Sequence, residues 1–189
     1  MKIKDVVIKT ALLLNREDII SFIERGYAVN SDLTKKDLST FVTMSNFIIN
    51  ELATEYVPVK KWERQIVKEG KIYFDNFNYS VKEIEKILTL DGENLKFKVF
   101  SDYIKVDGDT VDVFYTCLPS LADLEEEIIY KESDLPLRML AYGVARESCI
   151  IEGRFDEANQ WQIKFERGIK SVVVPKKLKN VIIKERSFY

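Results

Sequence analysis

The sequence predicts an α+β protein, with a helical body of about five helices, a small antiparallel β insert and an extended C-terminal tail. Apolar residues recur at helical spacing both before residue 59 and after residue 118. Between these limits the pattern changes to alternation, and 11 of the 22 aromatic residues lie between Tyr56 and Tyr115. The last 14 residues, KKLKNVIIKERSFY, have no apolar helical face. We therefore expect four segments: body helices over 1–58, the β insert over 59–118, further body helices over 119–174, and a tail over 175–189.

The first body segment contains signals for three helices. Residues 2–14 carry apolar positions on one face and predict the first. Asn15 is a candidate N-cap for the second, because acidic residues follow it, and Gly26 is its candidate C-cap.

The third helix has the longest apolar stripe in the chain. Thr34 and Asp37 have the spacing of a capping box, which predicts that the helix opens at Thr34. The stripe then continues from Leu38 to Tyr56 over about six turns of 3.6 residues. Pro58 predicts its end, because proline lacks the backbone N–H that a helix requires.

The β insert is predicted from alternation and turn residues. Residues 61–68 and 71–77 predict two strands separated by a turn at Gly70. Residues 81–90 have a spacing that suits a helix, but their setting between turn signals favours a strand. The dipeptides Asp91-Gly92 and Asp107-Gly108 each predict a hairpin. The remaining predicted strands are 95–100, 103–106 and 110–117.

After the insert, helical spacing returns. Residues 121–130 suit either a short helix or a loop. Asp134 is a candidate N-cap, with Pro136 in the first turn, for a helix that Gly153 closes. A last helix is expected over 155–170. The predicted apolar face of the helix before it comprises Leu137, Leu140, Ala141, Val144, Ala145, Ser148 and Ile151.

The tail differs from the body in charge and in apolar content. The whole chain has a net charge of −2, but residues 175–189 hold five basic residues and one acid, so they carry +4 and the rest carries −6. Pro175 is expected to stop the last helix. An apolar triplet and two terminal aromatics favour docking, either as a last strand of this chain or on a partner chain. The predicted partner-contact residues are Lys176, Lys177, Val181, Ile183, Arg186, Phe188 and Tyr189.

The composition excludes several kinds of enzyme. The chain has no His, which removes Ser-His-Asp and Cys-His catalysis and His-ligated metal sites. Its seven glycines are too far apart for a phosphate-binding loop. Cys117 and Cys149 are predicted to be buried thiols, because apolar residues flank each of them. We therefore expect no catalytic residues, no cofactor and no metal ion.

Several charged clusters have both a structural and a functional interpretation. The DGDTVD run at 107–112 has the wrong glycine position for an EF-hand and is better explained as a turn. The acidic run around 123–127 is typical of a solvated surface, and it also suits a basic tail from a neighbouring subunit. Arg138 and Arg146 are expected in ion pairs along or between helices. Lys60, Lys61 and Trp62, with the other aromatics of the insert, form a candidate stacking platform for single-stranded nucleic acid.

Three stretches of the chain resemble the head-to-tail connector proteins of tailed bacteriophages, also called adaptor, head-completion or neck proteins. They are the early helices, NREDIISFIERG and NFIINELATEYVPV, the end of the insert, DYIKVDGDTVDVFYTCLP, and the later helix pair, which contains LAYGVARESCIIEGRFDEA. The resemblance implies a non-enzymatic virion protein that forms a ring between portal and tail. It also implies portal, tail or neck proteins as partners, and it leaves contact with packaged DNA open.

Two alternatives remain beside this structural role. One is a nucleic-acid-binding module that uses the tail lysines and the aromatics of the insert. The other is an enzyme that relies on carboxylates or lysine alone, which would need two carboxylates facing each other in a cleft. No stretch approaches 18 uncharged apolar residues, so a membrane-spanning helix is not expected.

Overall fold

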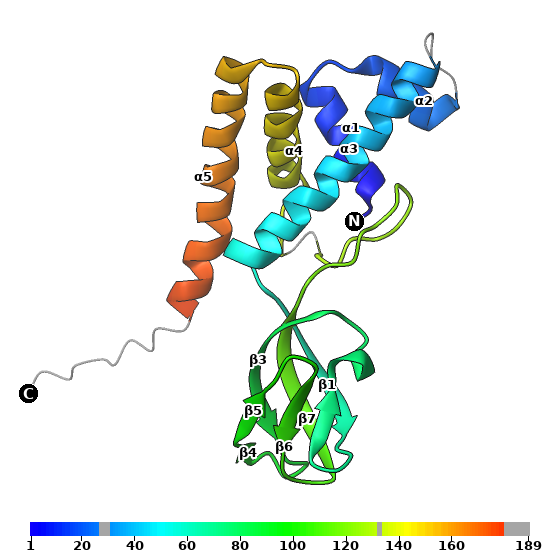
Figure 1. Cartoon of the computed structure of the whole chain (residues 1–189). Helices are drawn as coiled ribbons and strands as arrows, with labels where there is room; N and C mark the ends of the chain where they lie inside the picture. Colours follow the sequence, from blue (N-terminus) through cyan, green and yellow to red (C-terminus); the bar gives the residue numbers. More distant parts are fainter. Residues whose placement is uncertain (27–30, 132–133, 180–189) are drawn as a thin grey trace, which may run out of the picture. The chain divides into compact units, whose positions relative to one another are not determined.

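The computed structural model describes residues 1–26, 31–131 and 134–179, and the side chains of all of these except residue 31 and residues 174–179. Within this part of the chain the predicted α+β class is confirmed, with five α-helices and two small antiparallel sheets (Figure 1). The chain divides into two compact units, which we describe separately. The helical unit comprises Met1–Ile49 and Ala122–Tyr189, and the β unit comprises Asn50–Leu121.

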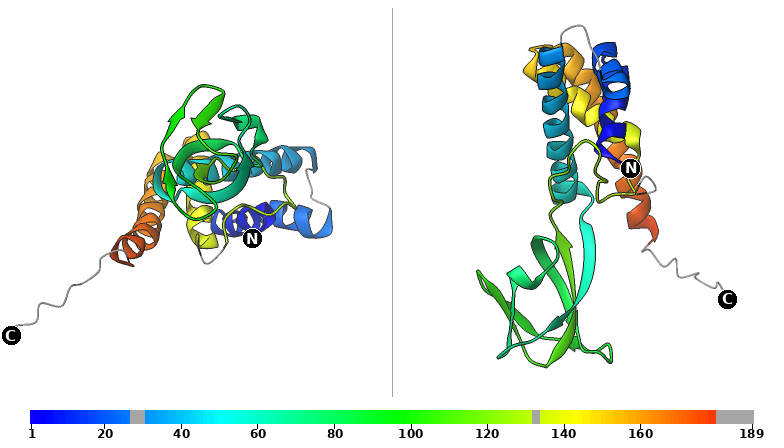
Figure 2. Two further views of the ribbon diagram at one scale, coloured as in Figure 1. Left: turned by 90° about the horizontal axis from the view of Figure 1, so that it is seen from below. Right: turned by 90° about the vertical axis from the view of Figure 1, so that its right-hand side faces the viewer.

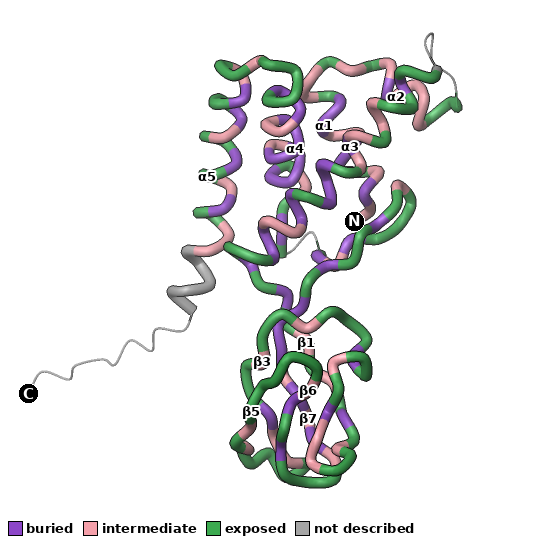
Figure 3. Tube along the Cα trace, in the orientation of Figure 1, coloured by how far each residue is buried: buried purple, intermediate pink, exposed green. Residues whose placement is uncertain are grey.

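The helical unit is built around α4. The helices are α1 (Ile3–Leu13), α2 (Glu17–Arg25), α3 (Ser31–Glu51), α4 (Leu137–Ile151) and α5 (Phe155–Lys179). A π-helical turn, Leu52–Tyr56, follows α3. Helix α4 packs against α5 and α1, and it lies beside α5 in the views of Figures 1 and 2. Its apolar face is buried along most of its length, whereas the connection to α5 is exposed (Figure 3).

Small residues allow the helices to approach α4 closely. A Cβ atom placed on Gly143 of α4 would lie 2.8 Å from Ile48 of α3 and 3.0 Å from the Phe165 ring of α5. A Cβ atom on Gly168 of α5 would lie 2.6 Å from Met139 of α4. Because glycine has a hydrogen atom in place of a side chain, these two positions let the helices approach more closely than a larger residue would.

The predicted starts of α2 and α3 are wrong. The N-cap of α2 is Arg16, and Asn15 instead adopts a left-handed conformation with φ of 55°, which asparagine tolerates better than most residues. Helix α3 begins at Ser31, so Thr34 lies inside the helix and is buried. Asp37 cannot complete a capping box there, because its carboxylate pairs with Arg16.

The predicted start of α4 is also wrong. Asp134 lies in a turn, where its N–H donates to the Lys131 carbonyl at 2.9 Å. Pro136 is the N-cap, and the helix begins at Leu137. The ring of a proline disfavours a helical conformation for the residue before it, so the helix cannot begin ahead of Pro136.

The prediction of an extended chain from residue 175 is wrong for residues 175–179. Helix α5 continues through Pro175 to Lys179, and the predicted stop at Val172–Pro175 does not occur. A proline in a helix interior removes one backbone hydrogen bond and costs about 3 kcal/mol. A long helix can continue past it when the residues that follow are good helix formers. The rest of the predicted tail, residues 180–189, lies outside the described residues.

The segment 121–130 is a loop, and it caps the start of α1. The backbone N–H groups of Ile3 and Lys4 donate to the carbonyls of Glu126 and Leu124, at 3.2 and 2.8 Å. These donors belong to the first turn of α1 and have no partner within the helix. The loop therefore supplies acceptors to this helix end together with the Asp5 carboxylate, which accepts from the backbone N–H of Lys2 at 2.7 Å.

The β unit contains two antiparallel sheets. Its strands are β1 (Val59–Ile66), β2 (Lys71–Tyr73), β3 (Val81–Leu88), β4 (Asn94–Leu95), β5 (Phe97–Val99), β6 (Tyr103–Val106) and β7 (Thr110–Cys117). One sheet has the order β1-β7-β3-β4 and the other has the order β2-β6-β5. Residues 81–88 are thus a strand, as their setting indicated. The core side chains come from both sheets and comprise Ile72, Phe77, Ile87, Ile104, Val106, Val111, Val113 and Tyr115.

Of the two dipeptides predicted to form hairpins, only Asp91-Gly92 does so. It joins β3 to β4, which pair with each other. Asp107-Gly108 instead connects β6 in one sheet to β7 in the other. Strand β7 pairs with β1 on one edge and with β3 on the other, so it has no edge left for β6.

We expect Gly143→Ala to lower the free energy of unfolding by about 1–3 kcal/mol, the usual cost of overpacking a core. The added methyl group would meet Ile48 and Phe165, and both are buried side chains with little room to move. Urea denaturation followed by circular dichroism measures the change.

Gln160→Ala, at an exposed position of α5, is the control. It adds no atom to the core, so the free energy of unfolding should change by less than about 0.5 kcal/mol. Gly168→Ala should be destabilising like Gly143→Ala, because its methyl group would lie 2.6 Å from Cγ and 3.2 Å from Cβ of the buried Met139. A loss for Gln160→Ala as large as that for Gly143→Ala would contradict the role assigned to Gly143.

Candidate functional site

The structure does not test the predicted contact residues of the tail. Val181, Ile183, Arg186, Phe188 and Tyr189 lie outside the described residues. The two predicted lysines, at positions 176 and 177, belong to the last turn of α5, and their side chains are not described. The contact role of the tail therefore remains a prediction. Its first residues, 175–179, are helical instead of extended.

The predicted stacking platform of the β unit is only partly assembled. Trp62 is 59% exposed and stacks on Phe114, with 6.3 Å between the ring centroids. Lys61 lies on the other side of β1, because successive side chains of a strand point to opposite faces. Lys60 forms an ion pair with Glu85. Charged residues near the exposed Trp62 ring are thus largely in ion pairs. Another such pair joins Arg64 Nε to Asp112 Oδ1 at 2.8 Å.

The acidic run of the loop has partners within the chain. Glu125 accepts hydrogen bonds from Lys4 at 2.9 Å and from Lys2 at 3.3 Å, and these bonds lower its pKa. Glu126 accepts from the backbone N–H of Asp123 at 2.7 Å. Glu125 is therefore paired within the chain by Lys2 and Lys4, while Asp123 and Glu127 remain exposed. The contact of this run with a basic tail of a neighbouring subunit stays a prediction.

Charged residues on the helices also pair locally. Arg146 contacts Glu147 at 2.6 Å, donates to Gln162 of α5 at 2.9 Å, and lies over the Phe165 ring. Arg138 lies over the Tyr142 ring at 5.4 Å. Arg146 therefore joins α4 to α5, whereas the contact of Arg138 lies within α4.

Arg16 connects α2 to α3. Its guanidinium donates two hydrogen bonds of 2.9 Å to the Asp18 carboxylate and a further one to Asp37. The hydrogen bonds from Arg16 lower the pKa of Asp18. Bidentate arginine–carboxylate pairs are among the stronger polar contacts in proteins. The cluster therefore fixes the position of α2 against α3.

Neither cysteine has the environment of a nucleophile. Cys117 and Cys149 are fully buried and unpaired by a disulfide, as predicted. Burial raises the pKa of both thiols, that of Cys149 to about 11. The reactive form of a cysteine is the thiolate, and reactive cysteines usually have a lowered pKa. Both residues act as small apolar side chains in the core.

Glu63 and Tyr115 form a polar contact inside the β unit. The Tyr115 hydroxyl donates to the Glu63 carboxylate, and burial followed by this hydrogen bond raises the pKa of Tyr115. Glu63 also accepts from the backbone N–H and the side chain of Asn78, at 3.2 and 3.1 Å. The carboxylate thus anchors the segment after β2 to β1, which is a structural task.

The described residues offer neither a metal-binding cluster of acids and cysteines nor a membrane-spanning helix. Residues 1–26, 31–131 and 134–179 contain no group of three or more Cys, Asp or Glu side chains that could hold a metal ion. None of the helices described is both long enough and apolar enough to cross a membrane.

The helical unit exposes a cluster of large apolar side chains at the connection between α4 and α5. Ile151 is 67% exposed and Phe155 is 68% exposed, with Ile150 beside them. We call these three residues the apolar tip. The prediction that Ile151 lies on the buried face of α4 is wrong, because Gly153 turns the chain, with φ of 72°, before α5 begins. Adjacent exposed apolar side chains are typical of a contact surface.

A second apolar surface lies along α1. Met1, Ile8 and Leu12, with Leu137 at the start of α4, line a hollow of about 280 Å³. Leu12 is 55% exposed. We call this surface the α1 hollow. Its Leu137 lies at the other end of α4 from Ile151, about 21 Å away at a rise of 1.5 Å per residue.

Sequence reasoning missed both surfaces. Leu137 and Ile151 belong to the periodic apolar face predicted for α4, so the pattern alone places both of them inside. The exposure of Ile151 and Phe155 depends on where the turn between α4 and α5 falls. Gly153 was a visible signal for that turn, but it does not report which side chains the other helices cover.

No protein-family model matches this chain, and no curated protein matches it.

We expect Arg16→Gln to lower the free energy of unfolding at neutral pH by about 1 kcal/mol, the upper range for partly exposed pairs. The contribution of Asp18 is present above its unfolded pKa of about 3.9 and is lost as the pH falls through its lower folded pKa. The difference in the free energy of unfolding between Arg16→Gln and the wild type should therefore become smaller below about pH 4. Urea midpoints at several pH values measure it.

Arg25→Gln, in the last turn of the same helix, removes the same charge and serves as the control. It should cost less than about 0.5 kcal/mol, as expected for an exposed surface position. A pH-independent loss for Arg16→Gln would show that its partner is not a titrating carboxylate.

Proposed function

We propose that this chain is a structural subunit of the neck of a tailed bacteriophage. In this role it forms a ring between the portal and the tail, and it performs no catalysis. The resemblance of its helices and of the end of its insert to head-to-tail connector proteins supports the proposal. The expected partners are further copies of the chain, the portal protein, and tail or neck proteins of the same virion.

The observation that carries the proposal is the presence of two different apolar surfaces on the helical unit. The apolar tip protrudes at the α4–α5 connection, whereas the α1 hollow is concave and is lined by other residues. A ring of identical subunits needs a heterologous contact, in which one surface of each copy meets a different surface of the next. We assign the tip and the hollow to the two sides of that contact.

The residues of the two surfaces suit each other chemically. The tip offers two isoleucines and a phenylalanine, and the hollow is lined mainly by aliphatic side chains, with Asp5 and Lys9 among them. Burying each large apolar side chain contributes about 1.5–3 kcal/mol. Three such side chains supply enough free energy to form the centre of a contact, with polar residues around it.

The proposal predicts which variants disrupt the ring. The double variant Ile151→Asp/Phe155→Asp removes the tip, and Leu12→Asp removes the hollow. We expect each variant alone to remain monomeric, because a charge in an apolar contact must be desolvated. A mixture of the two should form a species of two chains, because each chain retains one intact surface. Light scattering coupled to size-exclusion chromatography measures the mass, with and without the portal protein of the same phage.

Leu90→Asp is the matched control, since Leu90 is an exposed leucine in the β unit. It should assemble as the wild type does. The proposal fails if the wild type stays monomeric in both conditions or if the tip and hollow variants assemble normally. A mixture that remains monomeric would contradict the head-to-tail arrangement.

A second prediction concerns the C-terminal segment, which we assign to a neighbouring subunit or to the portal. Truncation after Lys179 keeps the whole of α5 and removes Val181, Ile183, Arg186, Phe188 and Tyr189. We expect it to weaken assembly onto portal-containing heads by roughly tenfold or more, or about 1.4 kcal/mol. Quantitative binding of the purified chain to such heads measures the effect.

Truncation after Val174 also removes the last helical residues, so comparing the two truncations separates the helix end from the tail. Unchanged helix content by circular dichroism is the control for folding. If the chain that ends at Lys179 assembles with unchanged affinity, the role of the tail is wrong.

A further inference from the structure

The β unit carries a row of lysines on one face of its smaller sheet. Lys105 of β6 lies directly opposite Lys71 of β2 and Lys98 of β5 in the strand register. Directly opposite residues project from the same face of a sheet, and neighbouring strands are about 4.8 Å apart. The other face holds Ile72 and Ile104, both fully buried, so the lysines point to solvent.

These three positive charges have no acidic partner among the described residues. None of them is in an ion pair, although the β unit has ten basic and thirteen acidic residues and a net charge of −3. Like charges directly opposite each other in a sheet are destabilising. Lys60 of the larger sheet, by contrast, forms an ion pair with Glu85. An acidic unit thus keeps an unmatched positive row on this face.

Aromatic rings extend the same face. Tyr73 lies opposite Tyr103 in the register, two positions along from the lysine row, and their ring centroids are 6.0 Å apart. Phe100 stacks on Tyr103 at 4.7 Å with an angle of 16° between the rings. Tyr73 and Phe100 nevertheless remain 44% and 42% exposed. We call the six residues the lysine–aromatic face: Lys71, Tyr73, Lys98, Phe100, Tyr103 and Lys105.

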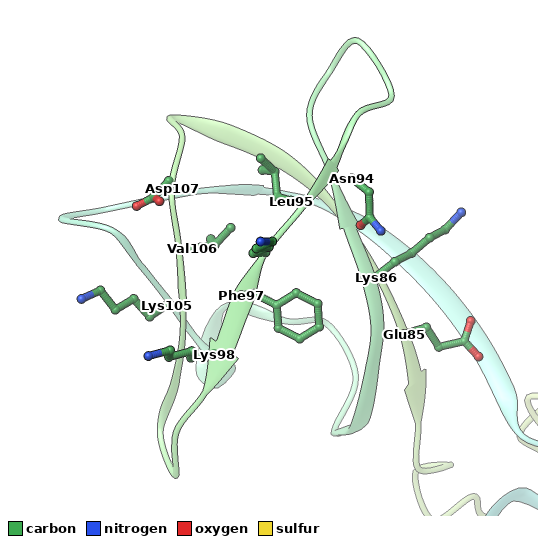
Figure 4. A pocket seen from close by; sticks show the side chains of 10 residues that line it. Glu85, Lys86, Asn94, Leu95, Phe97, Lys98, Lys105, Val106 and Asp107 are labelled. Carbon is green, nitrogen blue, oxygen red and sulfur yellow. The ribbon is translucent and has the colours of Figure 1, made fainter.

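Lys98 and Lys105 of the row also border a hollow of about 640 Å³. They extend from neighbouring strands to the same side, whereas Lys86 and Glu85 extend to the opposite side (Figure 4). Lys86 and Lys96 also line the hollow, together with two acids, Glu85 and Asp107. Since Glu85 is paired with Lys60, the lining has an excess of positive charge.

We propose that the lysine–aromatic face binds single-stranded nucleic acid. A row of lysines attracts the phosphate backbone, and exposed rings offer surfaces on which unpaired bases stack. A duplex satisfies only the first of these features, because its bases are already stacked on each other. This inference goes beyond the proposed structural function and does not rest on it. Its lysines differ from those of the tail and from Lys60 and Lys61, whereas its three aromatic residues belong to the aromatics of the insert that the sequence pointed to.

The binding test uses the whole chain and a fluorescein-labelled oligothymidylate of about 12 nucleotides, within the usual site sizes of small β domains. Fluorescence anisotropy is measured between about 50 and 200 mM salt. Three phosphate contacts predict a slope of about −2 for the logarithm of the binding constant against that of the salt concentration. A duplex of the same length and heparin serve as competitors.

Two variants separate charge from stacking. The triple variant K71Q/K98Q/K105Q should lose most of the affinity and of the salt dependence. It should not be less stable in urea, because it removes repulsion between like charges. Phe100→Leu should weaken binding of the oligothymidylate by roughly tenfold, the scale of one base–ring stack. The same variant should leave heparin binding unchanged.

The matched control is K35Q/K131Q/K170Q, which removes the same net charge from exposed positions of the helical unit. It should bind as the wild type does. The proposal is overturned if no binding occurs at low salt, or if the control triple loses as much affinity as the test triple. It is also overturned if Phe100→Leu has no effect while the duplex and heparin compete as well as the single strand, because the face would then recognise charge alone.

Discussion

The close packing of α4 against its neighbours is the constraint on which the helical unit depends. Its small residues let α3 and α5 approach until Ile48 and Phe165 nearly touch Gly143. Helices α1, α2 and α3 precede the β unit in the sequence, whereas α4 and α5 follow it. The apolar faces of α1 and α3 are therefore covered only when α4 and α5, which follow later in the chain, pack against them. The β unit can be inserted between the two groups of helices, because the pairing of Val59 with Cys117 places the two ends of the unit side by side.

Charge divides the surfaces of the molecule into matched and unmatched parts. In the helical unit, Arg16 and Glu125 have partners in the same chain and hold elements together. On the larger sheet, Lys60 and Arg64 are also paired with acids. On the smaller sheet the central lysine, Lys105, faces other lysines instead. Matched pairs are explained by contacts within the chain, so the two proposals rest on the unmatched lysine row and on the exposed apolar side chains.

Much of the fold was predictable from the sequence, because periodicity reports burial along a single element. The spacing of Leu140, Ala141, Val144 and Ala145 predicted the face of α4 that is buried. Helix starts were less predictable. Asp37 has the spacing of a capping residue, but its carboxylate pairs with Arg16 from another helix. The spacing of residues along one helix does not reveal a charged partner from another helix, because that partner comes close only when the chain folds.

The sequence by itself determined the α+β class, the order of the helices around the β insert, and the burial of both cysteines, since these depend on periodicity and on neighbours along the chain. The strand expected over 95–100 is instead divided into β4 and β5, which belong to different sheets. The tertiary structure alone decided the strand register, the partners of the charged residues and the exposure of Ile151 and Phe155. Lys71, Lys98 and Lys105 are far apart in the sequence, and nothing local marks them as a set. They form a row only because β6 lies between β2 and β5, and such non-local pairing is set by the folding of the whole unit.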